Sequence, residues 1–294
     1  QLQTFRPQEA RQSFYRARKL LTVHGDSLLA AQATMGMASE PILTSQLVRS
    51  GLEHLILSRL ERVLRVVELE AGHLAALRGA VKRGDIDRAL RRAFIGERAC
   101  GIGVFREAVD ASHVKKLPGL LGAHWRVFSR FTGLSELDQL RYLWTMRKVI
   151  KVLNRPWPER IDSVQRLHEK HGGASPFSMS EQLMPAYESA TKAAMLHAGK
   201  LRAAQAALAA AEYRAQHGEM PEGLEALTPG ILEAIPRDPA DGKPIRVRRK
   251  GDEWRFYSIG PDREDDGGTE EPDRREKDAV FRLYVGPQGV SETF

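Results

Sequence analysis

The chain has 294 residues, of which 42% are hydrophobic, and it carries a formal net charge of +7. This length is sufficient for two domains, each with a hydrophobic core of its own. No apolar run approaches the roughly 18 residues that a membrane-spanning helix requires, which argues against a span within the sequence given. The single cysteine, Cys100, excludes an internal disulfide, and its apolar neighbours predict a buried thiol.

The excess of basic residues raises the question of a nucleic-acid partner. Lysine and arginine clustered on one face bind phosphates by releasing counterions. Here the basic residues are spread along most of the chain, and between Glu53 and Glu68 they alternate with acids at helical spacing. This pattern favours a solvated surface of mixed charge over a nucleic-acid site. A basic helical scaffold that binds nucleic acid or another polyanion stays as the alternative function.

Residues 1–180 are predicted to form an all-helical, repeat-like domain. Their hydrophobic residues recur at steps of three to five, which is the period of an amphipathic helix. Two short helices, at 8–23 and 27–37, would pair as a helical-repeat unit. Further helices are predicted from Pro41 to about Gly72 and at 73–82, 85–110, 134–153 and 158–171.

Residues 181–294 are predicted to form a small α+β domain, so that the whole protein is mainly α. An alanine-rich helix at 182–217 would be its spine, because small side chains let another element approach closely. Two short helices, at 221–229 and 229–234, would follow. Three runs with strand-like alternation predict an antiparallel sheet packed on the spine. These runs are 245–249, 253–259 and 279–285.

The loop at 261–278 concentrates negative charge within this basic chain. Ca²⁺ takes roughly six to eight oxygen ligands, and a loop with carboxylates at alternate positions can wrap around it. Asp262, Glu264 and Asp266 alternate here, and Gly267 permits a sharp turn after them. The predicted flanks are strands, whereas an EF-hand requires helices on both sides, so the loop is not an EF-hand.

Two interpretations of this loop remain open. In the first, it is a solvated acidic hairpin that balances the charge of nearby basic residues. Those residues are Arg246, Arg248, Arg249 and Lys250. In the second, Asp262 and Asp278 close the two ends of the loop around Ca²⁺, and Asp265 or Asp266 contributes a further ligand. Such a cation would order a loop that is otherwise long and highly charged.

The last third of the chain also carries an ordered set of motifs. They are AEYRAQHGEMPEGLEAL, AIPRDPADGKPI, FYSIGPDREDDGG and DAVF. In this order and spacing, residues 202–281 resemble the globular part of the major pseudopilins of type II secretion systems. The resemblance implies a Ca²⁺ ion in the terminal loop, with Asp262 and Asp278 as carboxylate ligands. It also implies backbone carbonyl ligands, for which Ser258 and Ile259 are the nearest candidates.

The part of the chain before the spine differs from that family. Pseudopilins begin with an apolar membrane helix that continues into the spine, whereas about 180 residues of amphipathic helices precede it here. This N-terminal part looks like helical regions of planctomycete envelope proteins that also end in a pseudopilin-like tail. The sequence begins at Gln1 instead of Met, so we expect any signal or membrane anchor to lie upstream.

No motif in the sequence indicates catalysis. A nucleophile elbow, a phosphate loop and a histidine–carboxylate metal cluster are all missing, and the nearby His168 and His171 fit the polar end of a helix. The sequence therefore predicts a non-enzymatic structural or interaction protein of the cell envelope, periplasmic or extracellular. We expect protein partners in a larger envelope assembly, structural Ca²⁺, and membrane contact only through an upstream segment.

Overall fold

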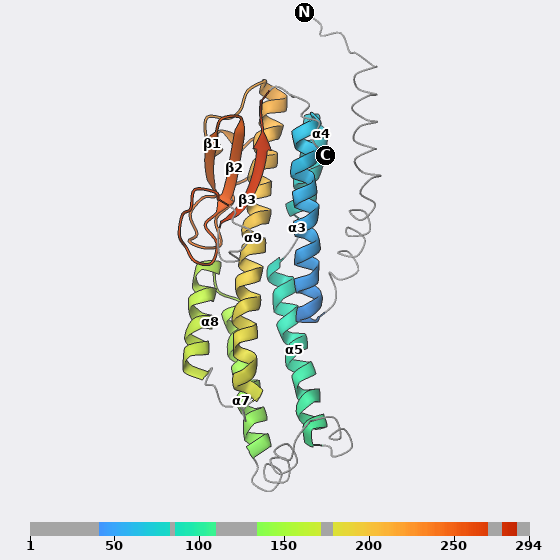
Figure 1. Cartoon of the computed structure of the whole chain (residues 1–294), viewed down its shortest axis with the longest axis vertical. Coiled ribbons are helices and arrows are strands. Elements are labelled where there is room, and N and C mark those ends of the chain that lie inside the picture. Colours follow the sequence, from blue (N-terminus) through green and yellow to red (C-terminus); the bar gives the residue numbers. More distant parts are fainter. Residues whose placement is uncertain (1–40, 83–85, 110–133, 172–178, 270–277, 287–294) are drawn as a thin grey trace, which may run out of the picture. The chain divides into compact units, whose positions relative to one another are not determined.

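The computed structural model describes residues 41–82, 86–109, 134–171, 179–269 and 278–286. The predicted helices at 8–23 and 27–37 lie outside these residues. In chain order the elements are α3 (Leu43–Val66), α4 (Ala71–Lys82), α5 (Ile86–Val109), α7 (Leu134–Val152), α8 (Trp157–His171), α9 (Met179–His217), the short 3-10 helix η2 (Leu224–Leu227), β1 (Arg246–Lys250), β2 (Glu253–Ser258) and β3 (Ala279–Tyr284). The mainly helical class with a small antiparallel sheet is confirmed (Figure 1).

Two predicted elements are wrong in detail. The helix that was expected to reach Gly72 ends at Val66, and Gly72 lies within α4. The backbone carbonyl of Glu70 accepts the first N–H groups of the new helix, so that the chain restarts there. The helix predicted at 229–234 is a turn, in which two successive N–H groups both donate to the carbonyl of Leu227.

Contacts divide the chain into two compact units that are not consecutive in sequence. Of the described residues, the sheet unit contains 48–82, 195–269 and 278–286. The helical unit contains 41–47, 86–109, 134–171 and 179–194. This division differs from the predicted split at residue 180, because α4 and most of α3 group with the sheet and α9 contributes to both units. Of the helices that the structure describes, none is both long enough and apolar enough to cross a membrane.

The C-terminal part of α9 is the spine of the sheet unit. Its alanines, such as Ala203, Ala206 and Ala210, are fully buried together with Leu208. Figure 1 shows the sheet along one side of this helix and α3 along the other. Gly199 marks a close approach, because a Cβ atom at this position would lie 2.7 Å from Cβ of Ser258 in β2. Small residues on the helix therefore allow the sheet to pack against its backbone.

The sheet has the strand order β1-β2-β3 with antiparallel pairing throughout. Its two faces differ in chemistry because neighbouring residues on a strand point to opposite sides. One face carries the paired Phe256 and Phe281, which are at most 1% exposed. The other face carries Arg248, Arg255 and Arg282, which lie opposite one another across the three strands. We call these three residues the arginine row.

Two glutamates of α3 contact charged or polar side chains of the spine helix α9. The ammonium group of Lys200, which is 2% exposed, lies 2.9 Å from Oε1 of Glu61 and also donates to the carbonyl of Val280. His197 Nε2 lies 2.5 Å from Oε2 of Glu53. Burial opposes ionisation of Glu53, but His197 and Arg49 together outweigh it and lower the pKa of this carboxyl. The predicted solvated surface on this helix is therefore wrong at both glutamates.

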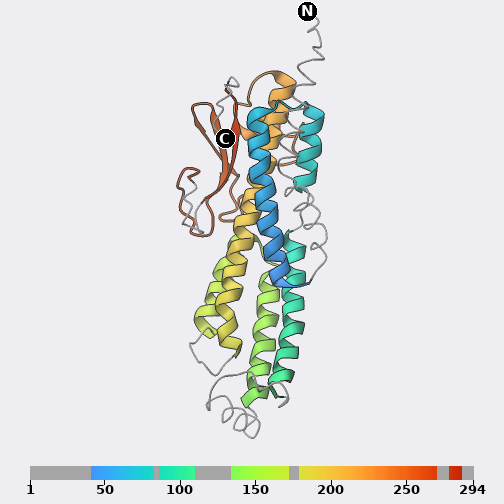
Figure 2. The same ribbon diagram turned by 45° about the vertical axis from the view of Figure 1, so that its right-hand side comes forward.

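Arg78 of α4 lies 3.0 Å from Glu212 of α9, which ties a second helix of the sheet unit to the spine. Figure 2 shows α4 near the C-terminal end of α3, after the short connection at 67–70. Glu212 is 6% exposed, so this pair is also largely removed from water. The sheet unit is thus held by a small-residue core and by ion pairs that cross between its helices.

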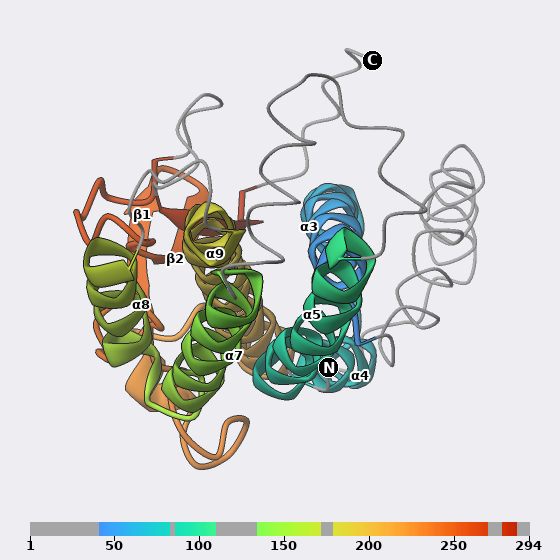
Figure 3. The same ribbon diagram turned by 90° about the horizontal axis from the view of Figure 1, so that it is seen from below.

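The helical unit combines α5, α7, α8 and residues 179–194 of α9, and Figure 3 shows α7 between α5 and α8. Side-chain contacts join α5 to each of the other three helices, and α8 to α9. They are Phe105–Tyr142, Asp87–Arg160, His168–Glu188 and Phe94–Tyr187. Cys100 is exposed, so the predicted burial of its thiol is wrong. The reason is that α5 turns its Phe94 and Gly101 side toward the neighbouring helices.

Candidate metal centre in the acidic loop

A buried carboxylate, Asp238, fixes the end of β2 from which the acidic loop leaves. Asp238 is 1% exposed and accepts hydrogen bonds from Ser258 Oγ (2.6 Å), Ile259 N (3.0 Å), Ala240 N (2.8 Å) and Arg246 Nη1 (2.9 Å). A buried carboxylate is tolerated when its oxygens accept hydrogen bonds and pair with a cation, and the carboxylate of Asp238 does both. The sequence indicated a turn at this position and gave no sign of its central role.

Arg246 joins this anchor to the loop. Its guanidinium lies 2.9 Å from Asp238, 2.7 Å from Asp241 and 3.1 Å from Asp265. Burial opposes ionisation of Asp241, but the hydrogen bonds and positive charges of Arg246 and Lys243 together outweigh it and lower the pKa of this carboxyl. One arginine therefore neutralises part of the negative charge that the loop brings to the sheet, as the first interpretation of the loop expects.

Asp265 uses both of its carboxylate oxygens within the loop. Oδ1 accepts from the hydroxyl of Tyr257 (3.0 Å) and from the N–H of Gly267 (3.0 Å), and Oδ2 accepts from Arg246. Burial, together with the hydrogen bond to this carboxylate, raises the pKa of Tyr257 to about 12. Asp265 thus holds the loop in shape, and it could bind a cation only by sharing or losing these donors.

Asp278 differs from Asp265, because no basic side chain of the described residues forms an ion pair with its carboxylate. The residue is 4% exposed, and Oδ2 accepts a hydrogen bond of 2.7 Å from the N–H of Gly268. Its Oδ1 atom is buried and receives no hydrogen bond within the described part of the chain. Burial and the negative charges of Asp266 and Asp265 raise the pKa of Asp278 to about 6, although the backbone N–H groups of Gly268 and Asp266 oppose this.

The structure thus groups Asp278 electrostatically with Asp266 and Asp265. Asp262 lies in the first turn of the loop, where its Oδ1 accepts from the N–H of Glu264 at 3.2 Å. Ile259 directs its N–H to the buried anchor, as described above. Across residues 41–82, 86–109, 134–171, 179–269 and 278–286, no group of three or more His, Cys, Asp or Glu side chains is arranged to hold a metal ion. The five-residue ligand set therefore stays a prediction.

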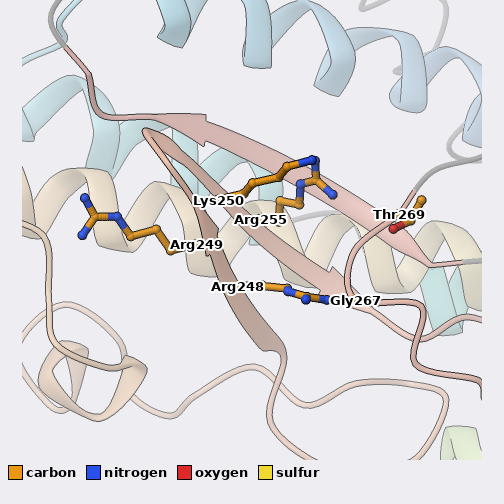
Figure 4. A pocket seen from close by; sticks show the side chains of 6 residues that line it. All are labelled: Arg248, Arg249, Lys250, Arg255, Gly267 and Thr269. Atoms are coloured by element: carbon orange, nitrogen blue, oxygen red, sulfur yellow. The ribbon is translucent and has the colours of Figure 1, made fainter.

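A pocket of ≈ 320 Å³ lies beside the acidic loop. Its lining residues, which we call the basic pocket, are Arg248, Arg249, Lys250, Arg255, Gly267 and Thr269 (Figure 4). From the sequence, three of these basic residues were expected only as counter-charges for the loop. The run RVRRK in a predicted strand was the available signal, since alternation places Arg248 and Lys250 on one face of the strand and Arg249 on the other.

The fold and these sites define a mainly helical protein with a small antiparallel sheet, an acidic loop and an adjacent basic pocket. Comparisons with family models, with curated proteins and with solved structures find no match to this chain. Function is therefore argued from the residues of the molecule.

Proposed function

We propose that this chain is a non-enzymatic structural or interaction protein of the cell envelope, with a pseudopilin-like sheet unit stabilised by Ca²⁺. The order of its elements supports the pseudopilin part of this proposal. A long spine helix is followed by a short 3-10 helix, a turn built on Asp238, and three antiparallel strands. The acidic loop lies between β2 and β3, in the place that the motifs assign to it.

The observation that carries the calcium proposal is the buried Oδ1 atom of Asp278, which accepts no hydrogen bond from any residue that the structure describes. A buried carboxylate oxygen without a donor is costly, and a divalent cation removes that cost by supplying charge and coordination. Asp266 and Asp265 lie close enough to raise the pKa of Asp278, so their oxygens are the candidates for further ligands. Asp262 and the carbonyl of Ile259 would complete the site if the loop closes around the ion.

The test is thermal unfolding of the whole chain in Ca²⁺ and in chelator. Ligand binding to the folded state raises the melting temperature, because it stabilises that state by RT ln(1 + [L]/Kd). We expect this rise in the natural chain and its loss in Asp262→Ala and Asp278→Asn. Glu222→Gln removes one exposed carboxylate outside the loop and serves as the charge control. An unchanged melting temperature of the natural chain in Ca²⁺ would rule out the calcium site.

The location is tested separately. Cell fractionation and protease treatment of intact cells and of cells with an opened envelope should show the protein outside the cytoplasm. Chemical cross-linking of the same cells should link it to an envelope protein. Recovery from the cytoplasmic fraction alone would contradict the envelope role without affecting the calcium result.

A further inference from the structure

The arginine row places three like charges directly opposite one another on one face of the sheet. Like charges in this position repel one another unless partners compensate them. Arg282 has two such partners, since it lies 3.8 Å from Glu61 and 3.7 Å from Glu253. Arg255 lies 2.5 Å from Glu253 and donates to the carbonyl of Gly268. These two members of the row are therefore compensated.

Arg248, the third member of the row, is not compensated. The structure gives this exposed guanidinium no hydrogen bond and no ion pair with any described residue, and the same is true of the exposed ammonium group of Lys250. The two residues are on the same face of β1, because they are separated by one position. Arg249, between them, faces the other way and lies over the ring of Trp254.

Figure 4 shows how these side chains enclose the basic pocket. Arg248 extends toward Gly267, the side chains of Lys250 and Arg255 lie near each other, and Arg249 turns away from them. Gly267 has a φ of 71°, and a Cβ atom there would lie 1.9 Å from Nη1 of Arg248. The missing side chain therefore lets the guanidinium lie against the loop. The volume of ≈ 320 Å³ falls at the small end of the range of ligand sites.

The charge of this pocket indicates the class of ligand. Arg248, Lys250 and Arg255 carry three positive charges, and Glu253 offsets one of them through Arg255. The remaining charge of about two matches that of a phosphate group near neutral pH. A planar guanidinium binds phosphate oxygens in a bidentate manner, and the ammonium group adds a compact second charge.

We propose that the basic pocket is a binding site for a small phosphate or phosphoester dianion, held by Arg248 and Lys250 with support from Arg255. The observations behind this proposal do not include the calcium site or the location of the protein. The pocket is small and lies on one sheet face, so we assign it to a soluble phosphate compound and not to an extended polyanion.

The test is isothermal titration of the whole chain with inorganic pyrophosphate, in chelator so that no Ca²⁺ takes part. We expect one site per chain. Arg248→Gln and Lys250→Gln should each weaken binding by about tenfold or more, because each removes a charge-assisted contact. Arg91→Gln removes the same charge from an exposed position on α5 that does not line the pocket, so the Kd should stay within about threefold.

Absence of binding at millimolar pyrophosphate, or equal losses in all three variants, would overturn the proposal. The latter result would show a diffuse effect of net charge. Parallel titrations with duplex DNA and with vesicles that contain phosphatidic acid distinguish the source of the phosphate. Tighter binding to either of them, with no effect of Arg248→Gln, would also overturn it. Melting curves of the variants confirm that each is folded before titration.

Discussion

Replacing Asp278 by asparagine should stabilise the protein when Ca²⁺ is removed. The asparagine keeps the shape of the side chain, and its carbonyl oxygen can still accept the hydrogen bond from the N–H of Gly268. Its amide group supplies donors toward the neighbouring carboxylates of Asp265 and Asp266. The substitution therefore removes a buried charge that has too little compensation, at little cost in packing.

The magnitude follows from the pKa of Asp278, which is raised from 3.8 to about 6. A carboxyl whose pKa is raised on folding binds its proton more tightly in the folded state, so the free energy of unfolding decreases as pH rises from about 4 to about 6. Above that pH the penalty is constant. Each pKa unit corresponds to about 1.4 kcal/mol, which gives a penalty of about 3 kcal/mol at neutral pH.

The assay is urea-induced unfolding of the natural chain and of Asp278→Asn in chelator, at several pH values between about 4 and 7.5. The difference between the two proteins should grow by about 3 kcal/mol across this range, with the variant more stable at the upper end. Taking the difference cancels the other carboxyls, such as Glu53 and Asp241, whose lowered pKa values act in the opposite direction. In saturating Ca²⁺ the gap should shrink or reverse, because only the natural chain keeps this ligand.

A difference that does not change with pH would refute this reasoning, since it would mean that the Asp278 carboxyl titrates normally in the folded state. A variant that is less stable in chelator at neutral pH would refute it as well. That result would show that a positive group of the chain itself already compensates the carboxylate.

Other substitutions test the packing and the buried charges, and the same urea assay applies to each. Gly199→Ala should lower the free energy of unfolding by about 1–3 kcal/mol through its clash with the sheet, whereas Gly51→Ala, where a Cβ meets nothing within 4 Å, should raise it by about 0.5–1 kcal/mol. Equal effects would contradict the close approach. Asp238→Asn should cost about 3 kcal/mol because it leaves buried donors and an arginine without their anion; a neutral effect would mean that the anchor is dispensable. Lys200→Met should cost about 3–5 kcal/mol by breaking a buried pair, whereas Lys82→Met, in an exposed pair, should cost less than about 1 kcal/mol; similar losses would refute the distinction.

Local periodicity explains why most of the fold could be predicted. The helices α5, α7, α8 and α9 agree with their predicted ranges within three residues at each end, and the three strands agree within one residue. In each case the information lies within the segment itself, as spacing of apolar residues or as strand alternation. The predictions are wrong where a backbone partner outside the segment determines the local structure. At residues 229–234, for example, the carbonyl of Leu227 accepts two N–H groups, and the chain forms a turn instead of the predicted helix.

The role of a charged residue could not be predicted in the same way, because its partner is distant in the sequence. Glu53 looks like a solvent-facing acid in its own helix, but it contacts His197, which is 144 residues away. Asp238 reads as part of a turn, yet two of its donors, Ser258 and Ile259, come 20 and 21 residues later. Residue type and spacing show that a charge is present, whereas only the fold shows whether it is buried and whether it has a partner of opposite charge.

On either side of the acidic loop lies a charged group that lacks a partner of opposite charge among the described residues. Among the residues that the structure describes, Asp278 on one side has an oxygen without a donor, and Arg248 on the other has no anionic partner. The backbone of Gly267 and Gly268 lies between them, since their N–H groups bind loop carboxylates while Arg248 and Arg255 contact the same glycines. A cation bound on the acidic side would lower the negative potential that an anion in the pocket experiences. By linkage the anion would favour the cation by the same free energy. The loop therefore joins the proposed calcium site to the basic pocket, and charge placed on one side bears on binding at the other.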